Sequence, residues 1–368
     1  MSAYIVAAAR SVIAPKGGLH AHTSLHAMGA PALLAAWKAR HAASKQSHFP
    51  QEPDLVILGN ALAAGGNPAR VCSLAVFSES VPALSIDTQC CAGIDAIALA
   101  SHAINAGNAH AVIAGGVESF SQAPLRARAT KQGVQFYEQA QFAPWPQRDP
   151  NVLTAAQAFA EAHKISRPEQ EAYAIESHAK ALRFAAAARV LTDSYTRALT
   201  QRACARFAPL VRNNACSITA ATVAPQADGA AALLVVDRQL ARNFPFFAQI
   251  IAHVQSGCDP TQPALAGVIA AKKLLGRLSK KDRQRIRCVE VMESFAAQAI
   301  HTQRELGFDS KCVNAHGGML AMGHPIGASG AVLAGNLFYR LMNEPVGSLG
   351  LAVIPAAGGL GSALLIRR

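Results

Sequence analysis

Short apolar runs alternate along the chain with longer stretches that carry apolar residues at helical spacing. Runs of this kind bounded by Gly, Pro, Asn or Asp are typical of buried strands, whereas longer periodic stretches are typical of helices. The pattern predicts strands over residues 4–9, 53–59, 83–87, 109–114, 227–237 and 350–354, with Gly115-Gly116 closing the fourth. It predicts helices over residues 91–105, 154–164 and 167–187. Strands and helices that alternate with short turns between them indicate a parallel α/β fold.

The two ends of the chain resemble each other. Residues 90–93 (Cys-Cys-Ala-Gly) open a helix that is followed by an apolar strand and a Gly-Gly pair. Residues 324–330 (His-Pro-Ile-Gly-Ala-Ser-Gly) open a second helix, again followed by an apolar strand and the pair Gly358-Gly359. This repetition predicts a duplicated α/β unit. Residues 119–150 show little periodicity and predict an excursion that lies over the core.

Composition narrows the class of protein. The 368 residues are 51% hydrophobic and 15% charged, which excludes a disordered chain and suggests more than one lobe. The formal charge of 34 − 22 = +12 favours anionic partners. No nucleic-acid motif accompanies the most basic stretch, residues 280–287, and no apolar run reaches the roughly 18 residues that a membrane span needs. We therefore expect neither nucleic acid nor a membrane as a partner.

The number and spacing of the cysteines indicate whether the protein binds a metal and in which compartment it resides. The eight cysteines have no metal-ligand spacing, so we expect no metal site. A chain of this size does not need disulfides, and the N-terminus reads as a strand without the features of a signal peptide. These features favour the reducing cytoplasm.

Cys90 is the first candidate for chemistry. It follows a strand and lies where a helix begins, so a thiolate there would face unpaired amide N–H groups and the positive end of the helix dipole. Such a position predicts a lowered cysteine pKa and a nucleophile at neutral pH. The alternative, for this cysteine taken alone, is a buried and inert thiol. Cys91 shares the location but points about 100° away along the helix, into packing.

The second candidate is His324, within a glycine-rich segment of residues 323–330. A histidine before Pro325 is held in an extended or turn conformation at a helix start, which presents its imidazole to a site. A third element, the glycine-rich turn of residues 358–361, could expose N–H groups to an oxyanion.

Together these segments resemble those of the thiolase family. Residues 86–93 are similar to its nucleophile segment, residues 114–121 to its second glycine signature, and residues 314–330 to its third. Residues 7–10 and 228–231 also fit, and the resemblance covers nearly the whole chain in the family's order.

The resemblance implies the five-layered α-β-α-β-α thiolase fold, with two similar halves and a loop domain that covers the site and binds coenzyme A. Residues 1–118 and 228–245 would form the N-terminal half, residues 119–227 the loop domain, and residues 246–368 the C-terminal half. It also implies a homodimer or homotetramer that uses acyl-CoA and CoA as substrates and needs no cofactor.

The implied chemistry proceeds through an acyl group on Cys90. His324 would assist deprotonation of that thiol, and the backbone N–H groups of Cys90 and Ala357 would form the oxyanion hole. The same resemblance implies substrate-binding positions, and these are Gly323, Gly327, Ala328 and Ser329.

The chain departs from the family's pattern at the expected acid/base and at the second oxyanion hole, and more mildly at Ala92 and residues 266–268. Family members usually carry a second cysteine, the acid/base, where this chain has Pro355, and proline cannot transfer a proton. A related subgroup places that cysteine where this chain has Ser294. Met292 replaces an asparagine of a second oxyanion hole, and a thioether cannot donate a hydrogen bond. The candidates for a substitute base are Glu293, His316 and Cys312.

Three functions of different classes remain open from the sequence. The first is an active acyl-CoA C-acyltransferase of lipid metabolism, which carries out thiolysis of 3-ketoacyl-CoA or Claisen condensation of acyl-CoA. The second is an enzyme that keeps only the acylation of Cys90, as an acyl carrier or thioesterase. The third is a non-catalytic, CoA-binding partner in a larger assembly.

The loop domain carries two further expectations. Residues 125–147 could form an arm between subunits, with Phe136 and Trp145 as anchors. Five basic side chains could meet the 3′-phosphate of CoA, and these are Arg126, Arg128, Lys131, Arg206 and Arg212.

Overall fold

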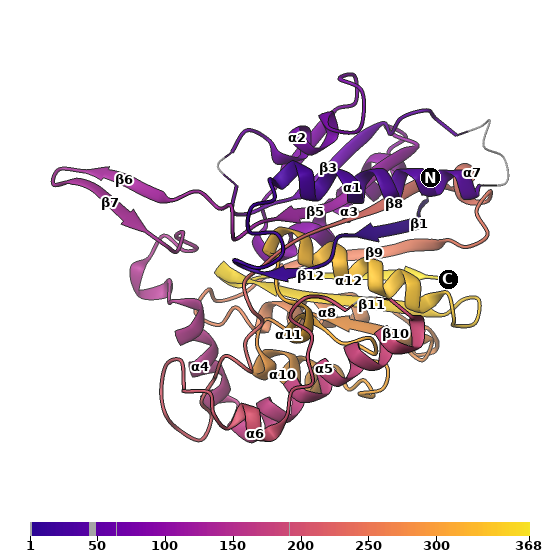
Figure 1. The fold of residues 1–368 in the computed structure, drawn as a ribbon. Coiled ribbons are helices and arrows are strands. Elements are labelled where there is room, and N and C mark those ends of the chain that lie inside the picture. The colour runs from indigo at the N-terminus through magenta and orange to yellow at the C-terminus, as the bar shows by residue number, and fades with distance from the viewer. Residues whose placement is uncertain (1, 44–48, 64, 191) are drawn as a thin grey trace.

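The computed structural model describes residues 2–43, 49–63, 65–190 and 192–368 (Figure 1). The N-terminal part contains β1 (Ala3–Arg10), β2 (Ala14–Pro15), α1 (Leu25–Lys38), β3 (Leu55–Gly59), α2 (Pro68–Leu74), β4 (Ala83–Ile86), α3 (Ala92–Asn105), β5 (Ala111–Glu118) and β8 (Ala227–Asp237). Between β5 and β8 lie β6 (Arg126–Thr130), β7 (Gly133–Tyr137), α4 (Val152–Ala162), α5 (Arg167–Ala188) and α6 (Gln201–Cys204). The C-terminal part contains α7 (Arg238–Ala241), β9 (Ala248–Gly257), α8 (Leu265–Gly276), α9 (Lys280–Arg283), β10 (Ile286–Val291), α10 (Ala296–Leu306), α11 (Met319–Met322), α12 (Ile326–Leu341), β11 (Leu349–Ala356) and β12 (Leu360–Arg367).

The sheet shows the same arrangement twice. In the N-terminal part the order is β3-β5-β8-β1, in which the first pair is parallel and the next two pairs are antiparallel. In the C-terminal part the order β10-β11-β12-β9 repeats these directions. A short antiparallel contact between β1 and β9 joins the two halves into one sheet of ten strands. The predicted duplication is therefore confirmed.

The burial pattern along the strands shows five layers. Because successive residues of a strand point to opposite faces, Val235 of β8 packs in the core that contains α3 and α12, whereas Leu234 packs in the core beneath α1 and α2. In the second half, Ile354 of β11 joins the α3–α12 core and Val353 joins the core beneath α8. The layers are thus α1 and α2, sheet, α3 and α12, sheet, and α8 with α10 (Figure 1).

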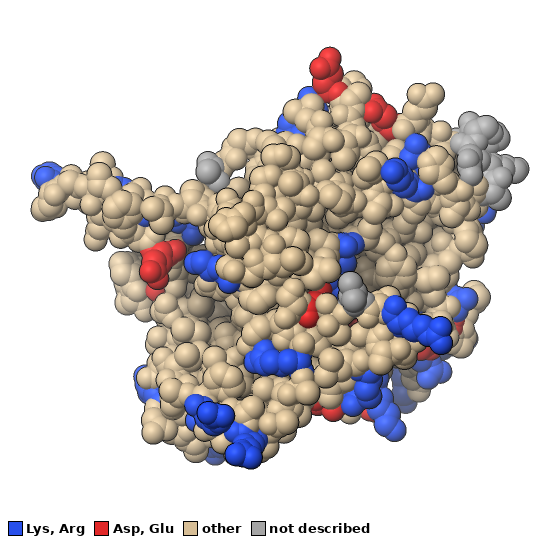
Figure 2. Space-filling model, in the orientation of Figure 1, with Lys and Arg blue, Asp and Glu red and all other residues tan. Residues whose placement is uncertain are grey.

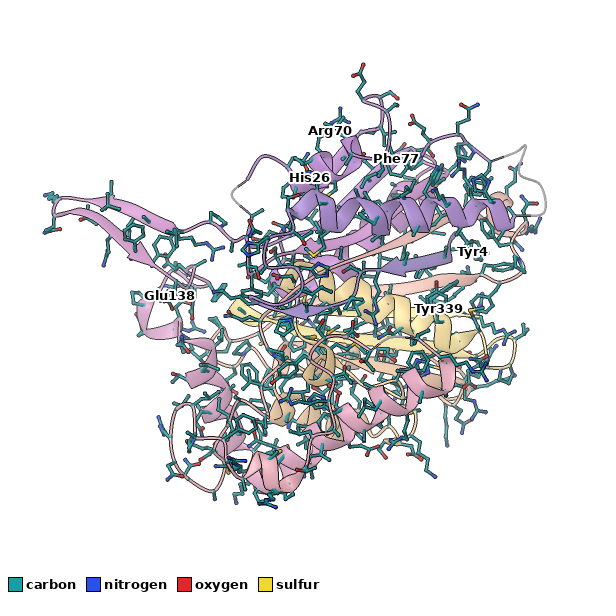
Figure 3. The ribbon with its side chains drawn as sticks, viewed as in Figure 1. Tyr4, His26, Arg70, Phe77, Glu138 and Tyr339 are labelled. Atoms are coloured by element: carbon teal, nitrogen blue, oxygen red, sulfur yellow. The ribbon has the colours of Figure 1, made fainter. Side chains whose placement is uncertain are left out.

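Helix α12 links the halves. It belongs to the C-terminal half by sequence, yet it packs on β5 and β8 as well as on β10 and β11. At its far end the hydroxyl of Tyr339 donates to the carbonyl of Ala8 on β1, a contact between α12 and the first strand (Figure 3). None of the described helices is both long enough and apolar enough to cross a membrane.

Two local predictions were wrong. Strand β5 does not end before Gly115 but continues to Glu118, because the two glycines pair with Ala232 and Ala231 of β8 in the middle of the sheet. Residues 119–150 do not all lie over the core, since β6 and β7 form a hairpin that projects from the body (Figure 1). That hairpin is exposed along almost its whole length, so it buries no apolar face of its own.

Candidate active site

Glycines allow the first turns of α3 and α12 to meet. A Cβ atom at Gly59, Gly93 or Gly116 would lie 2.5, 3.1 or 2.1 Å from the carbonyl oxygen of Gly327. Between the helices themselves, a Cβ at Gly93 would lie 2.4 Å from the Ala331 nitrogen, and one at Gly330 would lie 2.5 Å from the Ile94 nitrogen. Side chains at these positions would force the two helix starts apart, so this glycine contact sets the distance between the residues that precede them.

Those preceding residues are Cys90 and His324. Cys90 lies in a short 3-10 turn, Gln89–Cys91, between β4 and α3. Gln89 adopts a left-handed conformation with φ of 54°, and its N–H donates to the Asp87 carboxylate at 2.8 Å. His324 precedes Pro325 at the start of α12, and its Nε2 lies 3.1 Å from the Cys90 Sγ. The structure thus brings together two residues that are far apart in sequence.

The hydrogen bonds of His324 define its tautomer. Its Nδ1 lies 2.7 Å from the Ser329 hydroxyl, and that hydroxyl donates its single hydrogen to the Pro325 carbonyl at 2.9 Å. Ser329 must therefore accept from Nδ1–H. Nε2 is then the unprotonated nitrogen, and it can accept the proton of the Cys90 thiol.

Burial keeps both partners neutral. It raises the pKa of Cys90 to about 12, although the amide groups of Ala357 and of Cys90 itself act in the opposite direction. Burial also lowers the pKa of His324 to about 4. The prediction of a lowered Cys90 pKa was wrong, because the removal of water from the thiolate outweighs the amide groups at the helix start. The pair at rest is a thiol and an imidazole.

Two backbone N–H groups point at the Cys90 sulfur. The Ala357 and Cys90 amides both hydrogen-bond toward Sγ and stabilise its negative form. Ala357 opens a tight turn after β11, which continues through Gly358 and Gly359 with φ of 75° and 77°. Only glycine adopts such backbone angles readily. This glycine turn directs the Ala357 amide at the site, and the two predicted donors of the oxyanion hole lie together.

A cavity of about 740 Å³ leads to the pair. Its wall is mostly apolar, and much of it comes from the inserted residues between β5 and β8, such as Phe142 and Phe159. Among the described residues that line it, the charged side chains are Arg126 and Glu138. Figure 3 labels Glu138 where the chain leaves β7 toward α4.

The predicted substitute bases lie outside this cavity. Glu293 accepts hydrogen bonds from Ser177 and Asn314 at 2.7 Å each, from the Leu320 amide at 3.2 Å and from Tyr173 at 3.3 Å. The His316 ring stacks on Phe184 with the ring centroids 3.8 Å apart. The Cys312 thiol donates to the Asp309 carbonyl at 3.0 Å. The geometry therefore does not support these three residues as a base next to Cys90.

The residues that depart from the family's pattern take different positions. Pro355 and Ser294 line the cavity. Met292 does not, because it is fully buried in the core around α3 and α12. Its amide donates to the Val353 carbonyl at 2.9 Å. A methionine at this position thus contributes to packing.

The predicted substrate-binding residues at the start of α12 support the site from behind. Gly327 donates its N–H to Glu118 at 3.0 Å, and Ser329 holds the His324 ring. Gly323 has φ of 109°, and Ala328 is fully buried. None of the four lines the cavity, whereas Ile326 does. Direct contact between the four and a substrate stays a prediction.

Of the basic and aromatic residues predicted to act in the loop domain, only Arg126 lines the cavity. Arg126 lines the cavity and donates to the Ala61 carbonyl at 3.3 Å. The Arg128 guanidinium lies over the Tyr137 ring, and Arg212 pairs with Glu161 at 3.1 Å. The remaining predicted residues are exposed, and these are Lys131, Arg206, Phe136 and Trp145. Figure 2 shows Lys and Arg side chains spread over the visible face, with fewer acidic ones.

Glu118 was missed as a site residue. It ends the wholly buried strand β5, and its carboxylate accepts from the Asn60 side chain and from the amides of Ala61, Leu62 and Gly327. Burial raises its pKa to about 7 despite these bonds. Because Ala61 and Leu62 line the cavity, Glu118 ties the cavity wall to the start of α12. The sequence does contain a signal for this residue, because a carboxylate at the end of an apolar strand is costly to bury unless it has hydrogen-bond partners.

Two family models together match nearly the whole chain. The family model described as "Thiolase, N-terminal domain" matches residues 3–239, and "Thiolase, C-terminal domain" matches residues 244–368.

Among the described residues, no group of three His, Cys, Asp or Glu side chains could hold a metal ion.

Individual proteins resemble it over similar lengths. "Putative acetyl-CoA C-acetyltransferase YhfS" of Bacillus subtilis (strain 168) is 36% identical over 328 residues, which cover 85% of this chain and 86% of the relative. "Putative acetyl-CoA C-acetyltransferase VraB" of Staphylococcus aureus (strain MW2) is 31% identical and covers 100% of this chain and 99% of the relative. The crystal structure of the Bacillus anthracis acetyl-CoA acetyltransferase matches with a TM-score of 0.87 and 28% identity, over 100% of this chain and 98% of that one.

Proposed function

Because the chain belongs to the thiolase family, we propose that it is an acyl-CoA C-acyltransferase that works through an acyl thioester on Cys90. The observation that carries the proposal is the 3.1 Å contact between the Cys90 Sγ and the unprotonated Nε2 of His324. The pair lies in a mostly apolar cavity with two amide donors beside the sulfur. A nucleophile, a base and an oxyanion site in this arrangement are the parts that acyl transfer requires.

In the first half-reaction, the Cys90 sulfur attacks the thioester carbonyl carbon while its proton passes to Nε2 of His324. The negative oxygen that forms lies between the N–H groups of Cys90 and Ala357. Collapse of this intermediate breaks the bond from carbon to the CoA sulfur, and the departing thiolate takes the proton from His324. The pair thereby returns to neutral imidazole, and the acyl group remains on Cys90. General base catalysis of this kind contributes about 10²–10⁴ in rate.

In the second half-reaction an acceptor removes the acyl group. For thiolysis of a 3-ketoacyl-CoA, Cys90 is acylated by attack on the 3-keto carbon instead; the bond from this carbon to the α-carbon breaks, and the acetyl-CoA carbanion that leaves takes up the proton that Cys90 gave to His324. The thiol of CoA then loses its proton to His324 as its sulfur attacks the Cys90 thioester, and the Cys90 thiolate recovers that proton. For condensation, the acceptor is the α-carbon of a second acyl-CoA, and a base must remove a proton from carbon. The excess of basic side chains, a formal charge of +12, suits the phosphates of CoA in both cases.

Intact-protein mass spectrometry tests the proposal. Mixing with acetyl-CoA or acetoacetyl-CoA should add one acetyl group, which peptide mapping should place on Cys90 and which hydroxylamine should remove. If longer acyl-CoAs also leave the mass unchanged while CoA binds, the proposal fails. The chain would then be a CoA-binding partner without catalysis.

A second candidate function follows from Pro355, which lines the cavity where an acid/base would act. His324 can move a proton between thiols, because its Nε2 lies 3.1 Å from the Cys90 sulfur and the transfer breaks no bond to carbon. Removal of a proton from carbon is much harder. On this reading, the enzyme transfers acyl groups between thiols and forms no carbon–carbon bond.

Deuterium exchange separates the two candidates. In D₂O, a thiol-to-thiol transferase should move acetyl from acetyl-CoA to dephospho-CoA without placing deuterium on the acetyl carbon. A condensing enzyme should place deuterium there and cleave acetoacetyl-CoA. Pro355→Cys is the matched variant, because it puts a thiol into the cavity, and deuterium incorporation that appears only in this variant would support the second candidate. Incorporation at equal rates in both proteins would exclude it.

We also propose an oligomeric state and a cellular location. We expect a homodimer or homotetramer in the cytoplasm, with a role in lipid metabolism. In support of an assembly, the projecting hairpin exposes Leu125, Val134 and Phe136 by 87%, 69% and 67%, and exposed apolar patches of this kind mark contact surfaces. Light scattering on the purified chain would contradict this if it gave the mass of a monomer.

A further inference from the structure

A buried carboxylate, that of Asp95, accepts a hydrogen bond from the turn that carries Cys90. The Thr88 hydroxyl, two residues before Cys90, donates to Oδ2 of Asp95 on α3 at 2.6 Å. Thr88 also accepts from the Cys91 amide at 3.2 Å. Between them Gln89 holds its left-handed backbone, a conformation that persists only where neighbouring contacts fix it. The Thr88–Asp95 bond is one of those contacts.

The other oxygen of Asp95 reaches the opposite half of the molecule. Oδ1 accepts from the Ser362 hydroxyl at 2.8 Å and from Nε2 of His253 at 3.0 Å. Nε2 of His253 also lies 2.8 Å from the Ser362 oxygen, which accepts because its own hydrogen goes to Asp95. His253 is on β9 and Ser362 is on β12, so both belong to the C-terminal half. We call Thr88, Asp95, His253 and Ser362 the Asp95 clamp.

The centre of the clamp is buried, whereas Thr88 and His253 are partly exposed. Asp95 is 3% exposed, Ser362 is fully buried, and the His253 side chain is 11% exposed. Burial raises the pKa of Asp95, but the hydrogen bonds from His253 and Thr88 outweigh it and hold the pKa below its usual value. Asp95 is therefore an ionised carboxylate whose oxygens are both occupied. Loss of a donor would leave part of a buried charge unsatisfied, which is costly.

The two ends of the clamp coincide with the two ends of the oxyanion site. Thr88 leads directly into Cys90, whose amide is one donor. Ser362 lies on β12, which follows directly after the turn that carries the Ala357 amide, the other donor. These parts come from different halves of the molecule. A link between them fixes Cys90 relative to the Ala357 amide in a way that contacts within one half cannot.

We propose that the Asp95 clamp positions the nucleophile. It fixes the turn that carries Cys90 against the C-terminal half and so holds the Cys90 sulfur in place relative to His324 and the Ala357 amide. This inference rests on the proposed function for its effect on acyl transfer. The clamp residues do not touch the reacting atoms, and none lines the cavity. The group is also not a Ser-His-Asp catalytic triad, because serine and histidine both bond to the same carboxylate oxygen.

Thr88→Val is the sharpest variant, since valine keeps the shape of threonine and removes only the hydroxyl. The rate of acyl-enzyme formation at saturating acyl-CoA should fall on the order of 10²-fold, with KM nearly unchanged, because small misplacement of a nucleophile costs about that much. Thr88→Ser should restore most of the rate, because it keeps the hydroxyl. Asp95→Asn, a second variant of equal size, should show the same loss.

Alkylation by iodoacetamide gives a readout that does not depend on acyl transfer. Release of the turn should expose the Cys90 sulfur, so Thr88→Val should be labelled at Cys90 several-fold faster than the wild-type protein. Cys72 and Cys204, which are fully buried on other elements, serve as internal reporters and should stay unlabelled. Thr200→Val is the matched control, because it removes a threonine hydroxyl bonded to the Ala203 amide at 3.2 Å on α6. It should behave as wild type in both assays.

The outcomes are distinguishable. Thr88→Val with wild-type labelling and wild-type acylation overturns the clamp, and so does labelling of Cys72 and Cys204 along with Cys90, which would indicate general loosening. A loss of rate in Thr200→Val as large as in Thr88→Val also overturns it. Selective labelling of Cys90 in a protein whose wild-type form takes no acyl group would retain the clamp and reject the proposed acyl transfer.

Discussion

Cys90→Ala is expected to abolish acyl transfer while leaving the fold intact. The acyl-enzyme cannot form without the sulfur, and loss of the nucleophile in enzymes of this kind lowers turnover on the order of 10⁶-fold. Cys90 is partly buried at the edge of the core, so removal of its sulfur leaves the packing of α3 and α12 in place. The measurement is CoA release from acetyl-CoA and acetoacetyl-CoA, with intact mass to show that no acyl group is taken up.

Cys312→Ala is the matched control for that experiment. Its thiol is also partly buried, but it bonds to the Asp309 carbonyl outside the cavity, so activity should stay within about twofold of wild type. Acylation that persists in Cys90→Ala, or that disappears in Cys312→Ala, would show that the nucleophile has been assigned to the wrong cysteine.

His324→Asn is expected to slow acyl-enzyme formation by about 10²–10⁴, the usual contribution of a positioned base. Asparagine occupies similar space and forms hydrogen bonds, but it cannot take up the proton of the Cys90 thiol. Thiol attack would then have to start from the small fraction of thiolate, since burial raises the pKa of Cys90 to about 12. Single-turnover CoA release measures this step directly.

The pH dependence distinguishes a lost base from a distorted site. In the wild-type protein the rate should be level around neutrality and should fall as pH drops through about 4, where His324 becomes protonated and can no longer accept a proton. In His324→Asn the rate should instead rise by about tenfold for each pH unit below the thiol pKa, because only the thiolate reacts. A level profile in the variant would argue against His324 as the base.

Sequence reasoning selected Cys90 and His324, which the structure places 3.1 Å apart, because local patterns mark them. A strand that runs into a helix at Cys90, and a glycine-rich turn before a helix at His324, are visible in short windows. The apolar runs likewise located six of the strands β1 to β12 to within a few residues, since burial within a sheet imposes that pattern. These six are β1, β3, β4, β5, β8 and β11. Each of these features depends on neighbours along the chain.

The features that were missed depend on neighbours in space. The sign of the Cys90 pKa shift is set by burial under the inserted residues, a property that the helix start alone does not reveal. The partners of Asp95 lie 158 and 267 residues further along the chain. The separation of Glu293 from Cys90 follows from bonds to α5. Continuation of β5 through Gly116 follows from pairing with Ala231 of β8.

The placement of α12 has a consequence for how the protein is made. Synthesis on the ribosome finishes the N-terminal sheet with β8, but the helix that covers the inner face of this sheet is made only near the end of the chain. Until α12 emerges, apolar residues such as Val112, Leu233 and Val235 lack part of their native cover. Incomplete chains with uncovered apolar faces are prone to aggregate. The nascent protein therefore passes through a vulnerable period that ends when α12 docks, so the step that covers the N-terminal sheet also brings His324 to Cys90.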